Sequence, residues 1–370
     1  MLFTIEELLT IAKEKKVHMT VGLPPRIRIN GELVDLDYPK MTPADCEELI
    51  LSIMDERQKE LFKDRGELDF SFSSPNVGRY RVNVFRQRGS VACAMRVVGT
   101  VIPKPESLGV PKSVIELYAK KRGLVLVTGP TGSGKSTTLY ATLGELSKPN
   151  VNIVTVEDPV EKKIDGVNQC QINAKAGMTF AAALRSILRQ DPDIIMVGEI
   201  RDGETADIAI RAAITGHFVL STLHTNDAAS TIVRLVDMGV APYMVASSLV
   251  GIIAQRLVKL LCNECKETIT LSDPADLRLV SRDKPVQICQ AHKGGCKKCR
   301  GTGYSGRTAI HEIIVTSNDI KELISKGATA EEIGAKATEN GTLLLRDNVT
   351  QMVLAGRTTM DELVKATYTV

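Results

Sequence analysis

The chain has 370 residues, of which 43% are hydrophobic and 25% are charged. These values are ordinary for a folded globular protein, and the length predicts two or three domains. The net charge of only +3 is too small to argue for nucleic acid or an anionic membrane as a binding partner. The most apolar stretch, 241–261, is interrupted by Gln255, Arg256 and Lys259, so we expect a helix of the core and no membrane span.

The first residues, Met1–Glu7, lack a basic segment ahead of an apolar one, so no secretory signal is expected. We therefore expect a cytoplasmic protein that docks to a membrane complex through a partner.

Residues 1–100 are predicted to form an α+β domain with an antiparallel sheet. Helices are expected at 4–15 and, in two pieces, at 42–62. The expected strands cover residues 17–21, 26–30, 32–34, 67–73, 79–85 and 91–97. Asn30-Gly31 is a strong signal for a hairpin turn.

Alternation along these strands places Arg79, Arg81 and Asn83 on one face and apolar side chains on the other. Arg96, in the next strand, also lies opposite an apolar face. Two interpretations remain open: the basic face is simply solvated, or its arginines are directed at a phosphate group.

Three prolines within 101–111 exclude a continuous helix and predict a linker with a hinge. From residue 112 to 260, short apolar strands alternate with helices, a pattern typical of an α/β domain with a mostly parallel sheet. The expected strands are 123–128, 151–156, 194–197 and 217–221, and the expected helices are 137–143, 179–190 and 203–214.

A phosphate-binding loop follows the strand 123–128 and precedes a helix, and its spacing is G-x-x-x-x-G-K-[ST]. The nucleotide-binding residues are expected to be Gly129, Pro130, Thr131, Gly132, Ser133, Gly134, Lys135, Ser136 and Thr137. Glycines let backbone N–H groups converge on a di- or triphosphate, and the helix N-terminus adds positive potential. We expect Lys135 to reach the β- and γ-phosphates and Ser136 to hold Mg²⁺.

Acids and a histidine follow further apolar strands. Glu199 ends the strand 194–197, where it could hold the Mg²⁺ shell or polarise the attacking water. Glu157 and Asp158 follow another strand at the carboxyl end of a sheet, where ligands bind. His224 could sense the γ-phosphate, but it could equally be an ordinary core histidine.

Arg185 and Arg189 are four residues apart on an expected helix and would share its outer face. Arginine in cis or in trans can stabilise the charge of a phosphoryl group in transfer.

Eight cysteines are present, and four of them form two C-x-x-C pairs, Cys262–Cys265 and Cys296–Cys299. This spacing predicts a structural, tetrahedral zinc site, since four thiolates leave no open position. Cys289 and His292 lie close by in sequence and could compete as ligands. The remaining cysteines are expected to be small buried side chains, and short helices are expected from residue 320 onward.

These motifs, in this order, resemble the hexameric ATPases of type IV pili and type II secretion, the PilT-, PilB- and GspE-like proteins. Gly129–Thr137 looks like their Walker A, 155–161 like their Asp box, 189–202 like their Walker B, and 215–226 like their His box. The resemblance implies a RecA-like ATPase domain after a PAS-like α+β domain. The implied boundaries are 1–100, a linker at 101–111, the ATPase domain at 112–260, the zinc module at 261–310 and C-terminal helices at 311–370.

Residue by residue, the resemblance implies that Glu199 is the catalytic glutamate. The further catalytic residues that it implies are Glu157, His224, Arg81, Arg96, Arg185 and Arg189. It also implies ATP, Mg²⁺ and Zn²⁺ as ligands, a homohexamer, and a platform protein of the inner membrane as partner, with no nucleic acid.

Different segments of the chain resemble different branches of this family. The opening segment 17–33 looks like the pilus retraction motors, whereas 177–185, 234–240 and the cysteine cluster look like the assembly and secretion motors. We expect a motor of pilus assembly or type II secretion at the inner face of the membrane, with pilus retraction as the alternative. A nucleic-acid translocase is a remote alternative, disfavoured because aromatic residues make up only 4%.

Overall fold

The computed structural model describes residues 3–12, 15–29, 32–74, 77–98 and 102–368. The chain forms two compact units, Met1–Val101 and Ile102–Val370, each with a hydrophobic core of its own. The boundary differs from the expected linker, because residues 102–111 belong to the second unit. There Pro105 and Val110 are buried.

In its described residues, the first unit is an antiparallel sheet with three helices. In the sheet order β3-β2-β1-β6-β5-β4 the strands are β1 (Lys16–Met19), β2 (Arg26–Ile29), β3 (Glu32–Asp35), β4 (Glu67–Ser74), β5 (Gly78–Gln87) and β6 (Ser90–Val98). The helices are α1 (Ile5–Ala12), α2 (Pro43–Leu51) and α3 (Glu56–Arg65). The expected elements are therefore confirmed, apart from the Asn30-Gly31 turn, which lies outside the described residues. The likeness to a PAS domain stays a prediction.

Sequence periodicity explains this packing. The helical spacing of α1 buries Leu8 and Leu9, and the alternation of β5 buries Tyr80, Val82 and Val84 against the same core. Full burial of each large apolar side chain contributes about 1.5–3 kcal/mol. The polar face of the sheet is left outside this core.

The second unit is built on a seven-stranded sheet in which neighbouring strands are parallel except for β12 and β15. Its strands, in sheet order, are β15 (Tyr304–Val315), β12 (Leu249–Leu261), β7 (Gly123–Thr128), β11 (Phe218–Leu223), β10 (Ile194–Val197), β8 (Ile153–Glu157) and β9 (Val167–Gln171). This confirms the α/β fold with a mostly parallel sheet.

Helices cover both faces of this sheet. They are α4 (Lys112–Tyr118), α5 (Lys135–Leu146), α6 (Phe180–Ile187), α7 (Gly203–Ile214), α8 (Ala228–Asp237) and α9 (Pro242–Ser248). On β7, Leu124 and Leu126 belong to the core under α6–α9, while Val125 and Val127 belong to the core under α4 and α5. Burial on both faces explains why this strand is continuously apolar.

The expectation of a core helix over 241–261 is wrong for most of that segment. Helix α9 ends at Ser248 and the chain continues as the 13-residue strand β12. A strand buried on both faces has no alternation, so its apolar run resembles that of a buried helix. Gly251 lets Leu117 of α4 approach the strand, since a Cβ there would lie 2.7 Å from that side chain.

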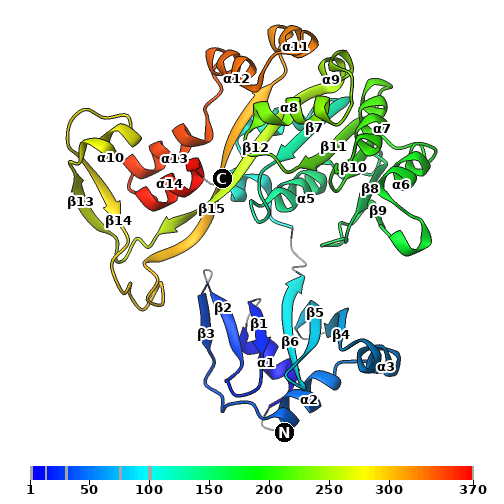
Figure 1. Ribbon diagram of the computed structural model, residues 1–370, viewed down its shortest axis with the longest axis vertical. Helices are drawn as coiled ribbons and strands as arrows, with labels where there is room; N and C mark the ends of the chain where they lie inside the picture. The colour runs from blue at the N-terminus through cyan, green and yellow to red at the C-terminus, as the bar shows by residue number, and fades with distance from the viewer. Residues whose placement is uncertain (1–2, 13–14, 30–31, 75–76, 99–101, 369–370) are drawn as a thin grey trace. The chain divides into compact units, whose positions relative to one another are not determined.

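The C-terminal part is not separate from the sheet. The long β12 and β15 run side by side towards a second, two-stranded sheet (Figure 1). Both expected boundaries, at 260/261 and at 310/311, fall within these strands. The remaining elements are β13 (Glu267–Leu271), α10 (Pro274–Leu279), β14 (Val286–Gln290), α11 (Asn318–Ser325), α12 (Ala330–Glu339), α13 (Leu345–Leu354) and α14 (Met360–Tyr368). Among the described residues, no helix combines the length and apolarity of a membrane span.

Candidate nucleotide and metal sites

The expected nucleotide-site residues follow four neighbouring parallel strands, β7, β11, β10 and β8. The phosphate-binding loop follows β7, His224 follows β11, Glu199 comes two residues after β10, and Glu157 ends β8. Parallel strands present their carboxyl ends at one edge of the sheet, so the fold brings these segments together.

The phosphate-binding loop is held by close backbone packing. Gly134 lies just before α5 with a φ of 90°, a conformation that favours glycine. A Cβ on Gly129 would lie 2.3 Å from the carbonyl oxygen of Gln255, so only glycine fits. The ammonium of Lys135 donates to the carbonyls of Gly129 and Pro130, at 2.7 and 3.1 Å. Burial lowers the pKa of Lys135, and nearby Glu199 partly opposes that shift.

This loop fits a bound phosphate chain. The hydroxyl of Ser133 is buried without a hydrogen-bond partner, and Ser136 is exposed in the first turn of the 12-residue α5. Unpaired N–H groups at a helix N-terminus favour an anion. The residues present are therefore those that a nucleotide and its Mg²⁺ require.

Gln255 of β12, which the sequence did not single out, fixes the loop from behind. Its amide donates to the carbonyl of Ser133 at 2.8 Å, and its carbonyl accepts from the hydroxyl of Thr138 at 2.8 Å. Gln255 is only 1% exposed, so its side chain is a structural support of the loop.

Glu199 lies between Arg201 and His224. Its carboxylate accepts from Arg201 at 2.6 Å and lies 3.5 Å from Nε2 of His224. The hydrogen bond from Arg201, more than any other cause, lowers the pKa of Glu199. The pKa of His224 is lowered, first by burial and then by Lys135. At neutral pH the site thus pairs a carboxylate with a neutral imidazole.

Glu157 differs from the expectation of an acid open to the nucleotide. Its side chain is 3% exposed and accepts hydrogen bonds from Tyr140, Thr155 and Gln169. These three donors satisfy the carboxylate inside the unit, whereas the adjacent Asp158 is exposed. Loss of Glu157 would leave buried donors without acceptors.

Arg185 and Arg189 are both exposed, but only Arg185 is helical. Helix α6 ends at Ile187, and the guanidinium of Arg189 turns back to donate to the carbonyl of Arg185 at 2.9 Å. The guanidinium of Arg185 is bound to Glu204 of α7 at 2.6 Å. The shared helical face is therefore not formed. Arg81 and Arg96 belong to the first unit, where β5 and β6 pair them directly.

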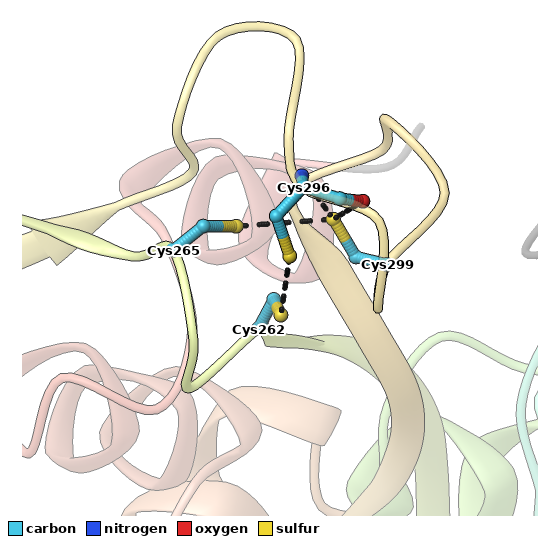
Figure 2. A group of neighbouring side chains, drawn as sticks. All are labelled: Cys262, Cys265, Cys296 and Cys299. Carbon is cyan, nitrogen blue, oxygen red and sulfur yellow. Dashed lines mark hydrogen bonds between the residues drawn. The ribbon is translucent and has the colours of Figure 1, made fainter.

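The four expected zinc ligands converge from two turns, one after β12 and one before β15. Their sulfur atoms all lie within 4.8 Å of one another, and Figure 2 shows them facing a common centre. Cys262 and Cys296 are 3.8 Å apart, as are Cys265 and Cys299. Tetrahedral zinc with Zn–S bonds of about 2.3 Å separates its sulfurs by about 3.8 Å, so the cluster fits that ion.

Backbone N–H groups of Cys296 and Gly303 point at the sulfur of Cys299, at 3.0 and 3.2 Å. The bond from Cys296 is the main reason that the pKa of Cys299 falls to about 6. The alternative ligands are engaged elsewhere: His292 bonds to Glu267, and Cys289 lies beside Thr268 and Gly356. The cluster therefore consists of the two C-x-x-C pairs alone among the described residues.

The second unit is similar to a known protein family. The family model described as "Type II/IV secretion system protein" matches residues 110–365. The chain belongs to this family.

The curated relatives include a pilus assembly ATPase and a type II secretion protein. The type IV pilus assembly ATPase PilB of Thermus thermophilus is 48% identical over 72% of this chain, which covers 30% of that protein. The type II secretion system protein HxcR of Pseudomonas aeruginosa is 47% identical over 71% of this chain, which covers 53% of it. The chain thus spans about half or less of the length of these curated relatives.

A solved structure extends the likeness to the whole chain. The pilus retraction motor PilT with bound ADP matches with a TM-score of 0.76 and 34% identity, over 99% of this chain and 97% of that one. The family assignment therefore includes the first unit as well as the second.

Two side chains of the candidate nucleotide site, Arg201 and Gln255, were not predicted from the sequence. Arg201 stands two residues after Glu199, so an acid followed by a nearby arginine could have signalled the pair. Gln255 is a lone polar residue in an apolar run, and that interruption was its only signal. In the sequence it argues only against a membrane span, because its structural role depends on contacts distant in sequence.

Proposed function

We propose that this chain hydrolyses ATP and is a motor of type IV pilus assembly or type II secretion. The observation that supports it most is the Glu199–His224 pair beside the phosphate-binding loop, at one edge of the sheet. A carboxylate fixed as an anion next to that loop is suited to orient or deprotonate an attacking water.

Each residue then has a distinct task. Lys135 would leave its carbonyl partners to bind the β- and γ-phosphates, and the hydroxyl of Ser136 would hold Mg²⁺, which would supply positive charge beside the phosphates. Glu199 polarises the water, and neutral His224 contacts the γ-phosphate side of the site. Glu157 acts from behind by holding Tyr140 and Gln169.

Arginines complete the site in a homohexamer. We propose that Arg81 and Arg96 of the first unit contact the γ-phosphate, so that ATP binding draws units together and hydrolysis releases them. Arg185 would have to exchange Glu204 for phosphate, and Arg189 would move with it. An arginine in this role is worth roughly 10³ to 10⁵ in turnover.

Two observations favour assembly or secretion over retraction as the work of this motor. The PilB and HxcR relatives and the cysteine cluster favour assembly or secretion. The match to PilT over the whole chain keeps pilus retraction as the second candidate. The partner in either case is a platform protein at the inner face of the cell membrane, and zinc in the cluster is structural.

Glu199→Gln tests the proposal. We expect it to keep ATP binding and to lose roughly 10² to 10³ in turnover, because an amide cannot act as the acid or base. The exposed Glu145→Gln is the matched control. Unchanged turnover in Glu199→Gln would remove the catalytic role from Glu199. Stimulation of the wild type by DNA rather than by phospholipid or platform protein would favour a translocase.

A further inference from the structure

The segment that carries His224 has no regular structure of its own. It joins the end of β11 to the start of α8, and side chains of other elements hold it in place. The hydroxyl of Thr128, the last residue of β7, accepts from the backbone N–H of Thr225 at 3.0 Å. Because Thr128 directly precedes the phosphate-binding loop, the His224 segment is fixed to the base of that loop.

Arg256 of β12 holds the middle of this segment. Its guanidinium donates to the carbonyl of Asn226 at 3.4 Å, and the side chain is only 8% exposed. Burial lowers the pKa of Arg256, while the carboxylates of Asp227 and Glu312 oppose that shift. Among the described residues, the Nε atom of Arg256 has no hydrogen-bond partner. A buried and incompletely bonded cation costs stability, so a role beyond packing would explain its presence.

Glu312 of β15 holds the end of the segment. One of its carboxylate oxygens accepts from the backbone N–H of Ala228, the first residue of α8, at 2.9 Å. The other accepts from the backbone N–H of Leu345, the first residue of α13, at 3.2 Å. Burial raises the pKa of Glu312, and these two bonds oppose that shift. The two bonds fix the orientation of the carboxylate and connect the His224 segment to α13.

Glu312 and Arg256 lie on the same face of the sheet. Strand pairing sets Glu312 opposite Ala254, which is two residues before Arg256 on β12. The two charged side chains are therefore diagonal neighbours, and both are directed at the core side that α8 covers.

We propose that Glu312 and Arg256 are positioning residues, which hold His224 beside Glu199 and the phosphate-binding loop. The inference rests on the proposed function, in which His224 contacts the γ-phosphate side of the site. Both residues act through the backbone of residues 226–228, which follow His224 closely, and not by contact with phosphate. A displaced His224 would no longer lie 3.5 Å from Glu199, so the loss should appear in turnover more than in nucleotide affinity.

Glu362 of α14 supplies the matched control. It is also a buried carboxylate, 6% exposed, and it also accepts a backbone N–H, that of Lys259 at 2.9 Å. Lys259 lies further along β12, towards the cysteine cluster. Glu362→Gln therefore alters a comparable buried carboxylate without a contact to the His224 segment.

The experiment measures kcat and KM for ATP and the thermal melt of the full chain. We expect Glu312→Gln to lower kcat and kcat/KM together, about tenfold, because the amide oxygen replaces only one of the two accepting oxygens. Its KM should stay within about twofold of wild type. Glu362→Gln should keep the kcat of the wild type, even where its melting temperature falls as far.

A second comparison removes the residue that is held. In a His224→Ala background, Glu312→Gln should change kcat by less than about twofold, because there is no imidazole left to position. Arg256→Lys keeps the cation but loses the guanidinium fork, so it should show the same pattern with a smaller loss. If Glu312→Gln does not fold, Arg256→Lys takes its place in both comparisons.

Three results would overturn the inference: a kcat in Glu312→Gln equal to that of Glu362→Gln, a loss confined to KM, or an equal loss with and without His224. In each case a strong loss of turnover in His224→Ala leaves the proposed function standing. If His224→Ala itself keeps full turnover, the proposed role of His224 fails, and the inference fails with it.

Discussion

The nucleotide site and the cysteine cluster are both held by the second unit, but they are stabilised in different ways. In the nucleotide site two central charged groups have partners within the protein: Lys135 is bound to backbone carbonyls and Glu199 to Arg201. In the cluster, four sulfurs converge with few other partners, the backbone donors to Cys299 being the clearest. The first site can fold before its ligand arrives, whereas we propose that the second gains most of its stability from a metal.

Lys135→Ala tests the nucleotide site, and we expect it to have the largest effect of the variants discussed here. It removes the charge that we propose binds the β- and γ-phosphates, so we expect roughly 10² to 10³ less ATPase activity with little loss of folding stability. Activity assays and thermal melts measure both quantities. The exposed Lys148→Ala is the control. Wild-type turnover in Lys135→Ala would refute the role of the phosphate-binding loop.

Cys296→Ser should show the opposite pattern. We expect about one zinc per chain in the wild type and loss of it in the variant. The fold around the cluster would then lose a large part of the roughly 10 kcal/mol that structural zinc contributes in small domains. Elemental analysis and hydrogen exchange should place the loss in residues 262–303, with β7 still protected. Cys289→Ser should keep its metal. Full metal in Cys296→Ser would reassign the ligands.

The two regions also differ in how far the sequence alone predicts them. Both cysteine pairs could be predicted, because ligand spacing within a turn is a local property. The phosphate-binding loop and the strand before Glu199 could be predicted for the same reason, since each is a strand followed at once by its functional residues.

Long-range packing could not be predicted in this way. The sequence does not show that β12 is a strand, because an apolar run buried on both faces has no period that separates strand from helix. It also does not show that Glu157 is satisfied internally, since Tyr140 and Gln169 come from other elements. The direct pairing of Arg81 with Arg96 depends on strand register, which only the paired strands reveal.

Gln255→Leu tests how far the nucleotide site depends on the protein alone, because it removes a partner of the phosphate-binding loop and no ligand. It leaves the Ser133 carbonyl and the Thr138 hydroxyl buried without partners, at a cost of about 2–4 kcal/mol in the free energy of unfolding. We also expect a higher KM for ATP. A double-mutant cycle with Thr138→Val checks the origin: the two losses should be less than additive. Additive losses would mean that the two residues act independently.

We expect the smallest effect from Arg201→Ala, which should displace the pH profile of ATPase activity. The hydrogen bond from Arg201 lowers the pKa of Glu199 more than any other cause, so its removal raises that pKa. Glu199 acts as a carboxylate, and activity falls as the pH drops through its pKa in the enzyme. The acid limb of the ATPase profile should therefore move to higher pH. His224 and Lys135 still favour the anion, so the displacement is partial.

Arg201→Lys should restore much of the profile, and Arg211→Ala, whose guanidinium is bound to Asp207 on α7, should leave it unchanged. An unmoved acid limb in Arg201→Ala would show that another group sets it, with His224 the first to test.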